Sequence, residues 1–229
     1  APRDSQERGE HAGIDQQVEA RELARGSATA QHQLVGEHID DGPHHMLLLE
    51  DLAPGEQGDQ LQGCDTKTAE AAVLQLVGLH GPSWNNSGLI GIDWLGSPDP
   101  EASGMVSELY QSALPGFLDR YGDALDREQQ DIISAFGSSE NIKQASLSEP
   151  FSLIHVDYRL DNLLLKQSGA DIQATVVDWQ SVTLGNPMTD VAYFIGAGML
   201  ADERRVAEKT LVKKYHDCLL AFGIAHYAF

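Results

Sequence analysis

The stretch that decides the fold of this protein is LIHVDYRLDNLLL, at residues 153–165. It starts with apolar residues, continues as a polar loop that ends at Asn162, and closes with three leucines. A Ser-Gly turn and the β-rich run ATVVD at residues 174–178 follow. Two short apolar runs around such a turn predict a β-hairpin with polar residues at its mouth. The hairpin would bring the loop that ends at Asn162 next to Asp178.

Three polar side chains could therefore meet at one point: Asp157, Asn162 and Asp178. Phosphoryl transfer from a nucleotide uses one carboxylate to orient the attacking hydroxyl and an amide and a second carboxylate to hold Mg²⁺. Each residue alone also has a structural explanation, because Asp and Asn are common in turns and at strand ends. Taken together at this spacing, they favour a reactive site.

Several motifs resemble one known family in the same order. The pattern His155-x-Asp157-x-x-x-x-Asn162 resembles the catalytic loop of the aminoglycoside/choline-kinase-like phosphotransferases, which are distant relatives of protein kinases. The motifs DW at 178–179, LGNP at 184–187 and TDVAY at 189–193 are similar to later elements of that family. The residues of these motifs resemble the branch that includes phosphotransferase domains linked to acyl-CoA dehydrogenases and ecdysteroid-kinase-like proteins.

The resemblance implies a role for each of these residues. Asp157 would be the catalytic base, and Asn162 and Asp178 would be the Mg²⁺ ligands. His155 and Asp190 would support the catalytic loop.

The resemblance also implies an ATP site. The apolar run at residues 46–49 predicts a buried strand that leads into Glu50, Asp51 and Leu52. This segment resembles the hinge strand of the family, whose backbone contacts adenine.

Some other side chains could act in the site or only stabilise the fold, and some are expected to be structural. Arg159 could meet phosphate oxygens or an acidic substrate group, or it could form a surface salt bridge. Tyr158 and Trp179 are expected to pack or to line the substrate site. His80 and His216 lie at helical positions and are predicted to be ordinary surface histidines.

The rest of the chain predicts helices. One begins after Asp65 and ends at Gly81-Pro82, and one spans 105–121 with a kink or break at Pro115. Another follows Asp126 with Ile132, Ile133 and Phe136 facing inward. Two more are expected at about 188–200 and 202–222. The predicted fold is a mainly helical α+β protein, namely the C-terminal lobe of a protein-kinase-like fold with a hinge strand and a catalytic hairpin.

The N-terminal lobe of that fold is expected to be largely missing. Residues 1–45 contain no Lys and no G-x-G pattern, whereas the family carries a glycine-bearing loop and a phosphate-gripping Lys before the hinge. We therefore expect an atypical, poorly ordered arm over 1–45, a phosphotransferase lobe over 46–229, and a fragment of a longer enzyme. Val156 also departs from the family, which has Gly there, and it would be tolerated if its backbone is extended.

Composition excludes several classes of protein. With 15 basic and 35 acidic residues the net charge is −20, which argues against nucleic acid or an anionic membrane as partner. No apolar run approaches the roughly 20 residues of a membrane span. The two cysteines, Cys64 and Cys218, show no metal-binding spacing, which fits the cytoplasm. Oligomeric state cannot be read from the sequence.

Two functions remain open. The first is an ATP- and Mg²⁺-dependent transfer of the γ-phosphoryl group to a hydroxyl of a small molecule. Acidity favours a cationic acceptor such as an aminoglycoside or choline, whereas the motif wording favours hydroxylated acyl compounds or other alcohols. The alternative is an inactive module, derived from the same fold, that binds a nucleotide, a metal or a partner. A protein kinase fits the motif wording less well.

Overall fold

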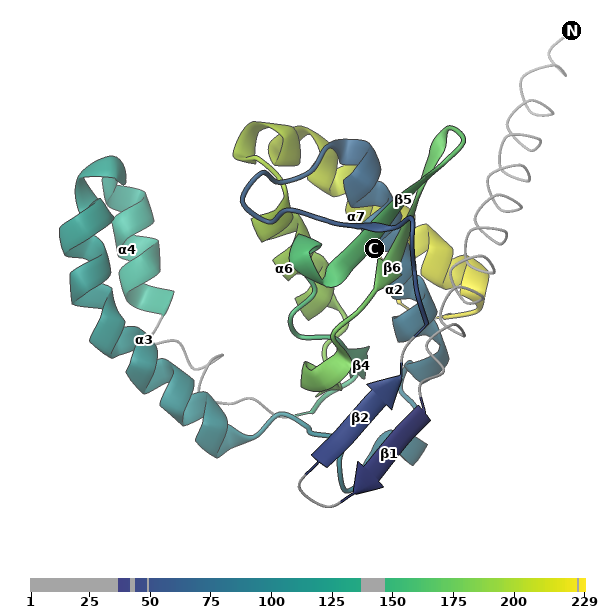
Figure 1. The fold of residues 1–229 in the computed structure, drawn as a ribbon. Coiled ribbons are helices and arrows are strands. Elements are labelled where there is room, and N and C mark those ends of the chain that lie inside the picture. The colour runs from purple at the N-terminus through teal and green to yellow at the C-terminus, as the bar shows by residue number, and fades with distance from the viewer. Residues whose placement is uncertain (1–36, 42–43, 49, 137–146, 226) are drawn as a thin grey trace, which may run out of the picture.

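The computed structural model describes residues 37–41, 44–48, 50–136, 147–225 and 227–229. The chain is a mainly helical α+β protein, as the sequence predicts. Helices α2 (Thr66–Ser83), α6 (Met188–Gly198) and α7 (Ala201–Phe222) form its body (Figure 1). Among the described residues no helix has the length and apolar character needed to cross a membrane.

Helix α2 runs through the centre of the body. It begins where predicted, because the Asp65 carboxylate accepts a hydrogen bond from the Thr68 N–H at 2.8 Å. The predicted stop at Gly81-Pro82 is wrong, since the helix continues to Ser83. Gly81 serves close packing instead: a Cβ there would lie 2.7 Å from the ring of Phe222 on α7.

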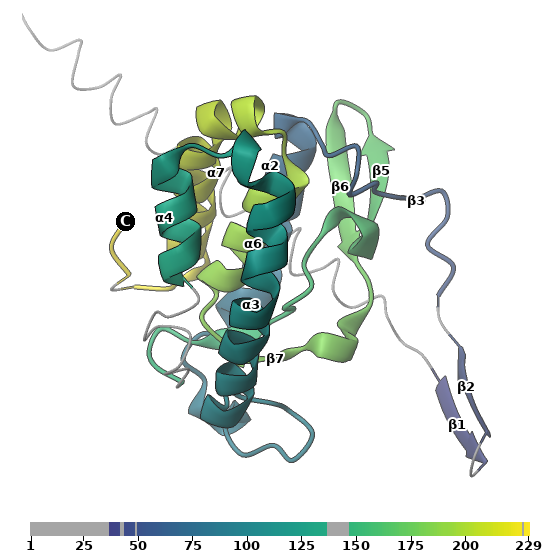
Figure 2. The ribbon, with the colours of Figure 1, turned by 90° about the vertical axis from the view of Figure 1, so that its left-hand side faces the viewer.

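The predicted hairpin is present. Strands β5 (Leu163–Ser168) and β6 (Asp171–Val176) pair antiparallel, with Leu163 opposite Val176. The short strand β3 (Glu56–Gln57) adds to the other edge of β5. Figure 2 shows this sheet on one side of the helical body. The open end of the hairpin is therefore the place where the polar loop ends at Asn162 and β5 begins.

A two-stranded sheet pairs the strand before the polar loop with a strand that follows the β5–β6 hairpin. Strand β4 (Ser152–Ile154) precedes the loop and pairs with β7 (Thr183–Gly185), which precedes α6. The main core lies between this region, the hairpin and the three helices. Its largest fully buried side chains are Tyr158, Tyr215, Phe194, Leu76, Leu160, Leu163, Leu211 and Leu219.

Helices α3 (Pro100–Tyr121) and α4 (Arg127–Phe136) form a helical hairpin that projects from the body (Figure 1). Pro115 does not divide α3, because a carbonyl freed by proline can bond to water on this exposed helix. The inward orientation predicted for Ile132 and Phe136 is wrong, since these residues are 61% and 55% exposed. Their apolar pattern reflects contacts within the hairpin, such as the Phe136 ring against Tyr110 at 5.5 Å.

The strand expected at 46–49 is present as β2 (His44–Leu48), which pairs antiparallel with β1 (Glu37–Asp41). Strand β1 falls within the segment 1–45 that composition set apart. Residues 44–45 of that segment begin β2, and residues 1–36 and 42–43 lie outside the described residues.

Candidate active site

Asp157 and Asn162 lie in direct contact. The Asn162 amide nitrogen donates to both the backbone oxygen and Oδ2 of Asp157, each at 2.9 Å. Asn162 ends a short 3₁₀ turn, Leu160–Asn162, that leads straight into β5. Since both bonds use the amide nitrogen, its Oδ1 is the atom left for a cation or another donor.

Asp178 stands at the neighbouring strand end. Val177 donates its N–H to the Asn162 carbonyl at 3.0 Å, so the residue after β6 is bonded to the loop before β5. Asp178 follows Val177 in the left-handed conformation, with φ 64° and ψ 63°, and its side chain is exposed. The hairpin register therefore brings the backbones of the three candidate residues to one end of the sheet.

His155 is fully buried and links the loop to the same strand end. Its Nε2 lies 3.0 Å from the Val177 carbonyl, and its own carbonyl accepts the Ser181 hydroxyl at 2.7 Å. Its ring also packs against Tyr158 and Trp179, with centroids 5.8 and 5.1 Å away. Tyr158 and Trp179 thus contribute packing, which is one of the two roles expected of them.

Asp190, on α6, holds the backbone of the candidate catalytic loop, residues 155–162. Its Oδ2 accepts the His155 N–H at 2.7 Å and its Oδ1 accepts the Val156 N–H at 2.9 Å. A third contact comes from His80 of α2, whose ring Nε2 lies 3.3 Å from Oδ2. The carboxylate is completely buried, so these donors replace its water shell.

The two histidines predicted to lie on the surface are buried. His80 is 0% exposed and His216 is 7% exposed. Burial lowers the pKa of His80, and the hydrogen bond and charge of Asp190 oppose this change. Helical periodicity alone does not show how many neighbours a helix will have. Helix α2 packs against α6, α7, β4 and β6, so several of its faces are buried.

Val156 adopts a left-handed backbone with φ 72°, not the extended backbone that would tolerate it. A left-handed backbone is unfavourable by about 1–2 kcal/mol for a residue with a Cβ, and more restrictive for a β-branched one. The two N–H groups held by Asp190 belong to Val156 and to the residue immediately before it.

Replacing Val156 by Gly should therefore raise stability relative to Val156→Ala. Both variants remove the branched side chain, which is 41% exposed and outside the core clusters, but only Gly relieves the strain. We expect the Gly variant to exceed the Ala variant by about 1 kcal/mol in free energy of unfolding. Urea unfolding measures the difference, and equal stabilities would contradict the assigned strain.

Arg159 forms ion pairs with acidic neighbours. Its Nε lies 3.6 Å from Asp157 Oδ2, and its Nη2 lies 3.0 Å from Asp161 Oδ2. The side chain is 38% exposed, so the guanidinium remains open to solvent on one side. The salt bridge considered from the sequence is present, and it involves the candidate base itself.

Sequence analysis missed two glutamines that hold this loop from far along the chain. Gln60 accepts the Leu160 N–H through Oε1 at 2.9 Å, and its own N–H donates to Asp161 Oδ1 at 3.0 Å. Gln57 donates to the Asp161 carbonyl at 2.6 Å. A glutamine in a polar loop has no recognisable sequence signal. Gln60 and the residues that it contacts are also about 100 positions apart, so no local pattern links them.

The segment expected to contact adenine is a turn next to the hairpin. Glu50 and Asp51 are exposed, and the Asp51 carboxylate accepts the Ala53 N–H at 3.0 Å. Leu52 accepts the Gly55 N–H at 2.9 Å, and the chain then enters β3 beside β5. The candidate hinge is thereby connected to the strand that follows Asn162.

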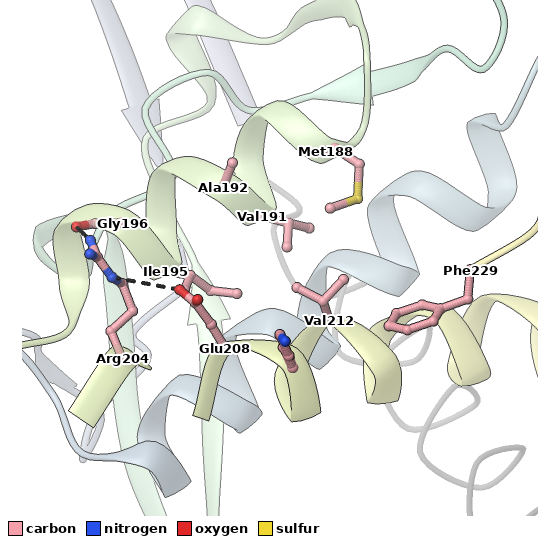
Figure 3. Close-up of a pocket in the computed structure, with 10 residues that line it drawn as sticks. Met188, Val191, Ala192, Ile195, Gly196, Arg204, Glu208, Val212 and Phe229 are labelled. Carbon is pink, nitrogen blue, oxygen red and sulfur yellow. Dashed lines mark hydrogen bonds and ion pairs between the residues drawn. The ribbon is translucent and has the colours of Figure 1, made fainter. Parts of the chain in front are cut away.

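A pocket of about 420 Å³ opens between α6 and α7 (Figure 3). Its apolar lining includes Val191, Ile195 and Val212, and Arg204 at one end bonds the Gly196 carbonyl and pairs with Glu208. None of the candidate site residues is among the described residues that line it. The pocket is therefore separate from the catalytic loop.

The cysteines are poorly suited to nucleophilic chemistry. Burial, assisted by neighbouring carboxylates, raises the pKa of Cys64 to about 12 and that of Cys218 to about 11. Both thiols therefore keep their protons near neutral pH.

No group of three or more His, Cys, Asp or Glu side chains in the described part of the chain is arranged to hold a metal. The donors that remain at the loop are the Asn162 Oδ1 and the exposed Asp178 carboxylate. Such a pair suits Mg²⁺, which keeps several water molecules and uses few protein ligands together with substrate phosphates.

Comparison with known proteins identifies relatives of this chain. A sequence profile of the Phosphotransferase enzyme family matches residues 37–216. The Mus musculus protein "Acyl-CoA dehydrogenase family member 10" is 50% identical over 42 residues, which are 18% of this chain and only 4% of that protein. It agrees with the branch that the motifs resemble.

Two solved structures are similar at low identity. The macrolide 2'-phosphotransferase of Brachybacterium faecium has a TM-score of 0.45 and 15% identity, over 86% of this chain and 69% of that one. The choline kinase of Cryptosporidium parvum has a TM-score of 0.48 and 15% identity, over 83% of this chain and 59% of that one. The profile match spans most of this chain and includes the whole catalytic loop, Asp178 and Asp190. This chain therefore belongs to the phosphotransferase enzyme family.

Proposed function

We propose that this chain transfers the γ-phosphoryl group of ATP to a hydroxyl group of a small molecule. The observation that carries the proposal is the contact between Asp157 and Asn162 at the end of the hairpin that also bears Asp178. Family membership supports the phosphotransferase class.

In the proposed reaction, Asp157 accepts the proton of the attacking hydroxyl. Its Oδ2 already interacts with Asn162 and Arg159. Among the described residues, Oδ1 has only a long contact of 3.5 Å, with the Tyr193 hydroxyl. Oδ1 is therefore the better acceptor for the substrate proton. The hydroxyl oxygen bonds to the γ-phosphorus, the bond from that phosphorus to the bridging oxygen breaks, and ADP leaves.

Asn162 and Asp178 are the residues that would hold Mg²⁺ in this proposal. When bound, Mg²⁺ neutralises the charge of the phosphates. Asn162 would contribute Oδ1, because its amide nitrogen is committed to Asp157. The backbone of Glu50, Asp51 and Leu52 would contact adenine, and Arg159 would lie near enough to Asp157 to meet a phosphate oxygen.

The proposed acceptor is a small molecule, and two observations favour different chemical classes for it. A net charge of −20 favours a cationic acceptor, such as an aminoglycoside or choline. The relative named for acyl-CoA dehydrogenases favours a hydroxylated acyl compound. We further propose a cytoplasmic location, where ATP is available and both free thiols stay reduced.

The second candidate is a module that binds nucleotide, metal or a partner without turnover. Its support is the lack of any Lys before Lys67 and of a G-x-G pattern in the first 45 residues. A positioned cation contributes several kcal/mol to phosphoryl transfer, so a site without one would bind more readily than it reacts.

ADP release distinguishes the two functions. The chain, and a form extended upstream in its reading frame, are incubated with ATP, Mg²⁺ and either cationic or acyl alcohols. Acceptor-dependent ADP release that stops when EDTA removes Mg²⁺ is the expected result. Binding of MgATP by both forms, with no turnover on any acceptor, would overturn the proposal in favour of the binding module.

A further inference from the structure

A chain of buried hydrogen bonds runs from α7 to the catalytic loop. The Tyr215 hydroxyl on α7 lies 2.6 Å from His80 Nδ1 on α2. His80 Nε2 lies 3.3 Å from Asp190 Oδ2, and Asp190 binds the N–H groups of His155 and Val156. Tyr215, His80 and Asp190 are all 0% exposed, so water does not compete for these bonds.

The direction of each bond follows from which groups can donate. The Asp190 carboxylate only accepts, and the lowered pKa of His80 favours a neutral ring with a single N–H. Burial raises the pKa of the Tyr215 hydroxyl, so that group keeps its proton. One arrangement satisfies every group: Tyr215 donates to Nδ1, and Nε2–H donates to Asp190.

The other tautomer of His80 leaves a conflict. With the proton on Nδ1, the ring would donate to the Tyr215 oxygen, and the bare Nε2 would face the Asp190 carboxylate at 3.3 Å. Two acceptors in contact within a buried site are unfavourable, and the carboxylate would lose one of its three donors. The Asp190 carboxylate therefore selects the Nε2–H tautomer, and the Tyr215 hydroxyl supplies the donor that the bare Nδ1 needs in this buried site.

We propose that Tyr215 is a positioning residue that acts through His80 and Asp190 to hold the catalytic loop in its strained turn at Val156. The turn needs such support because Val156 occupies the left-handed region with a branched side chain. Local strain persists only where surrounding contacts determine the conformation. Here one carboxylate binds the N–H groups of two successive residues, His155 and Val156, and the orientation of that carboxylate depends on His80.

The tautomer can be measured directly in the full chain labelled with ¹⁵N. Long-range ¹H–¹⁵N spectra of the imidazoles show which His80 nitrogen carries the proton, and hydrogen exchange reports on the His155 and Val156 amides. We expect the Nε2–H form in the unmodified chain. In Tyr215→Phe the ring keeps its Nε2–H toward Asp190 but loses the donor at Nδ1, so we expect the Nδ1 resonance to shift and these two amides to exchange at least about tenfold faster.

Tyr158→Phe is the matched control. Tyr158 is equally buried, and its hydroxyl donates to the Ala72 carbonyl at 2.7 Å rather than to His80. It should lose comparable stability and leave the His80 Nδ1 resonance unchanged. In a Val156→Gly background, Tyr215→Phe should speed exchange of the residue 156 amide less, because the strain is gone.

Two results would overturn the proposal. One is an Nδ1–H tautomer in the unmodified chain, a measurement that does not require any variant to fold. The other is a folded Tyr215→Phe chain with unchanged exchange at both amides. These readouts do not depend on activity, so a chain without phosphotransfer but with the expected tautomer would reject the proposed function alone. The loop is called catalytic on the basis of that function.

Discussion

Replacing Asp157 by Asn lowers kcat by about 10²- to 10⁴-fold, which is the contribution typical of a positioned general base. The substitution preserves shape, but an amide cannot take the proton of the attacking hydroxyl. The Asn162 amide nitrogen, which donates to Asp157 at 2.9 Å, retains an oxygen acceptor in one orientation of the new side chain. Affinity for ATP should therefore change little, and the effect should fall on kcat rather than KM.

Steady-state ADP release with the best acceptor measures this effect. Asp171→Asn serves as the control, because Asp171 is exposed at the opposite end of the same hairpin. It should leave kcat within about twofold, since surface substitutions seldom have larger effects. A kcat for Asp157→Asn within tenfold of the unmodified chain would remove Asp157 from the role of base.

The second large effect is expected from Asp190→Asn, as a loss of stability of about 3 kcal/mol. The buried carboxylate accepts from His155, Val156 and His80. An amide offers one acceptor oxygen and turns an NH₂ group toward donors, so at least one buried N–H is left unpaired. The strained turn at Val156 would lose its support at the same time.

Urea unfolding followed by circular dichroism measures this loss. Asp202→Asn is the matched control, because its side chain is 99% exposed and forms an ion pair with Arg205 at 2.8 Å. A surface pair of this kind contributes about 0–1 kcal/mol. If Asp190→Asn destabilised the chain no more than Asp202→Asn does, the bonds to the loop backbone would not hold it in place.

Much of the fold was accessible from local sequence. The hairpin β5–β6 was predicted because apolar runs and the Ser168-Gly169 turn are neighbours in the chain. The start of α2 was predicted because an aspartate cap acts on a residue three positions away. Helical periodicity gave the wrong burial for Ile132, which is exposed, and for His80, which is buried. Burial depends on which other elements pack against a helix, and periodicity does not contain that information.

The candidate site divides in the same way. The motif spacing suggested that Asp157 and Asn162 meet, and the structure contains that contact. The supporting shell was largely invisible, because Gln60 and Tyr193 reach the loop from distant segments and have no characteristic pattern. Val156 was recognised as a departure from the family, but its left-handed backbone required coordinates.

The sequence alone determined the family, the order of its motifs and the hairpin that joins Asn162 to the end of β6, because these depend on residues close together in the chain. Only the tertiary structure decided what holds the loop. Tyr215 and His80 are 135 residues apart, and His80 and Asp190 are 110 apart. Their bonds form only after helix packing has excluded water and brought three separate helices together, which no local pattern records.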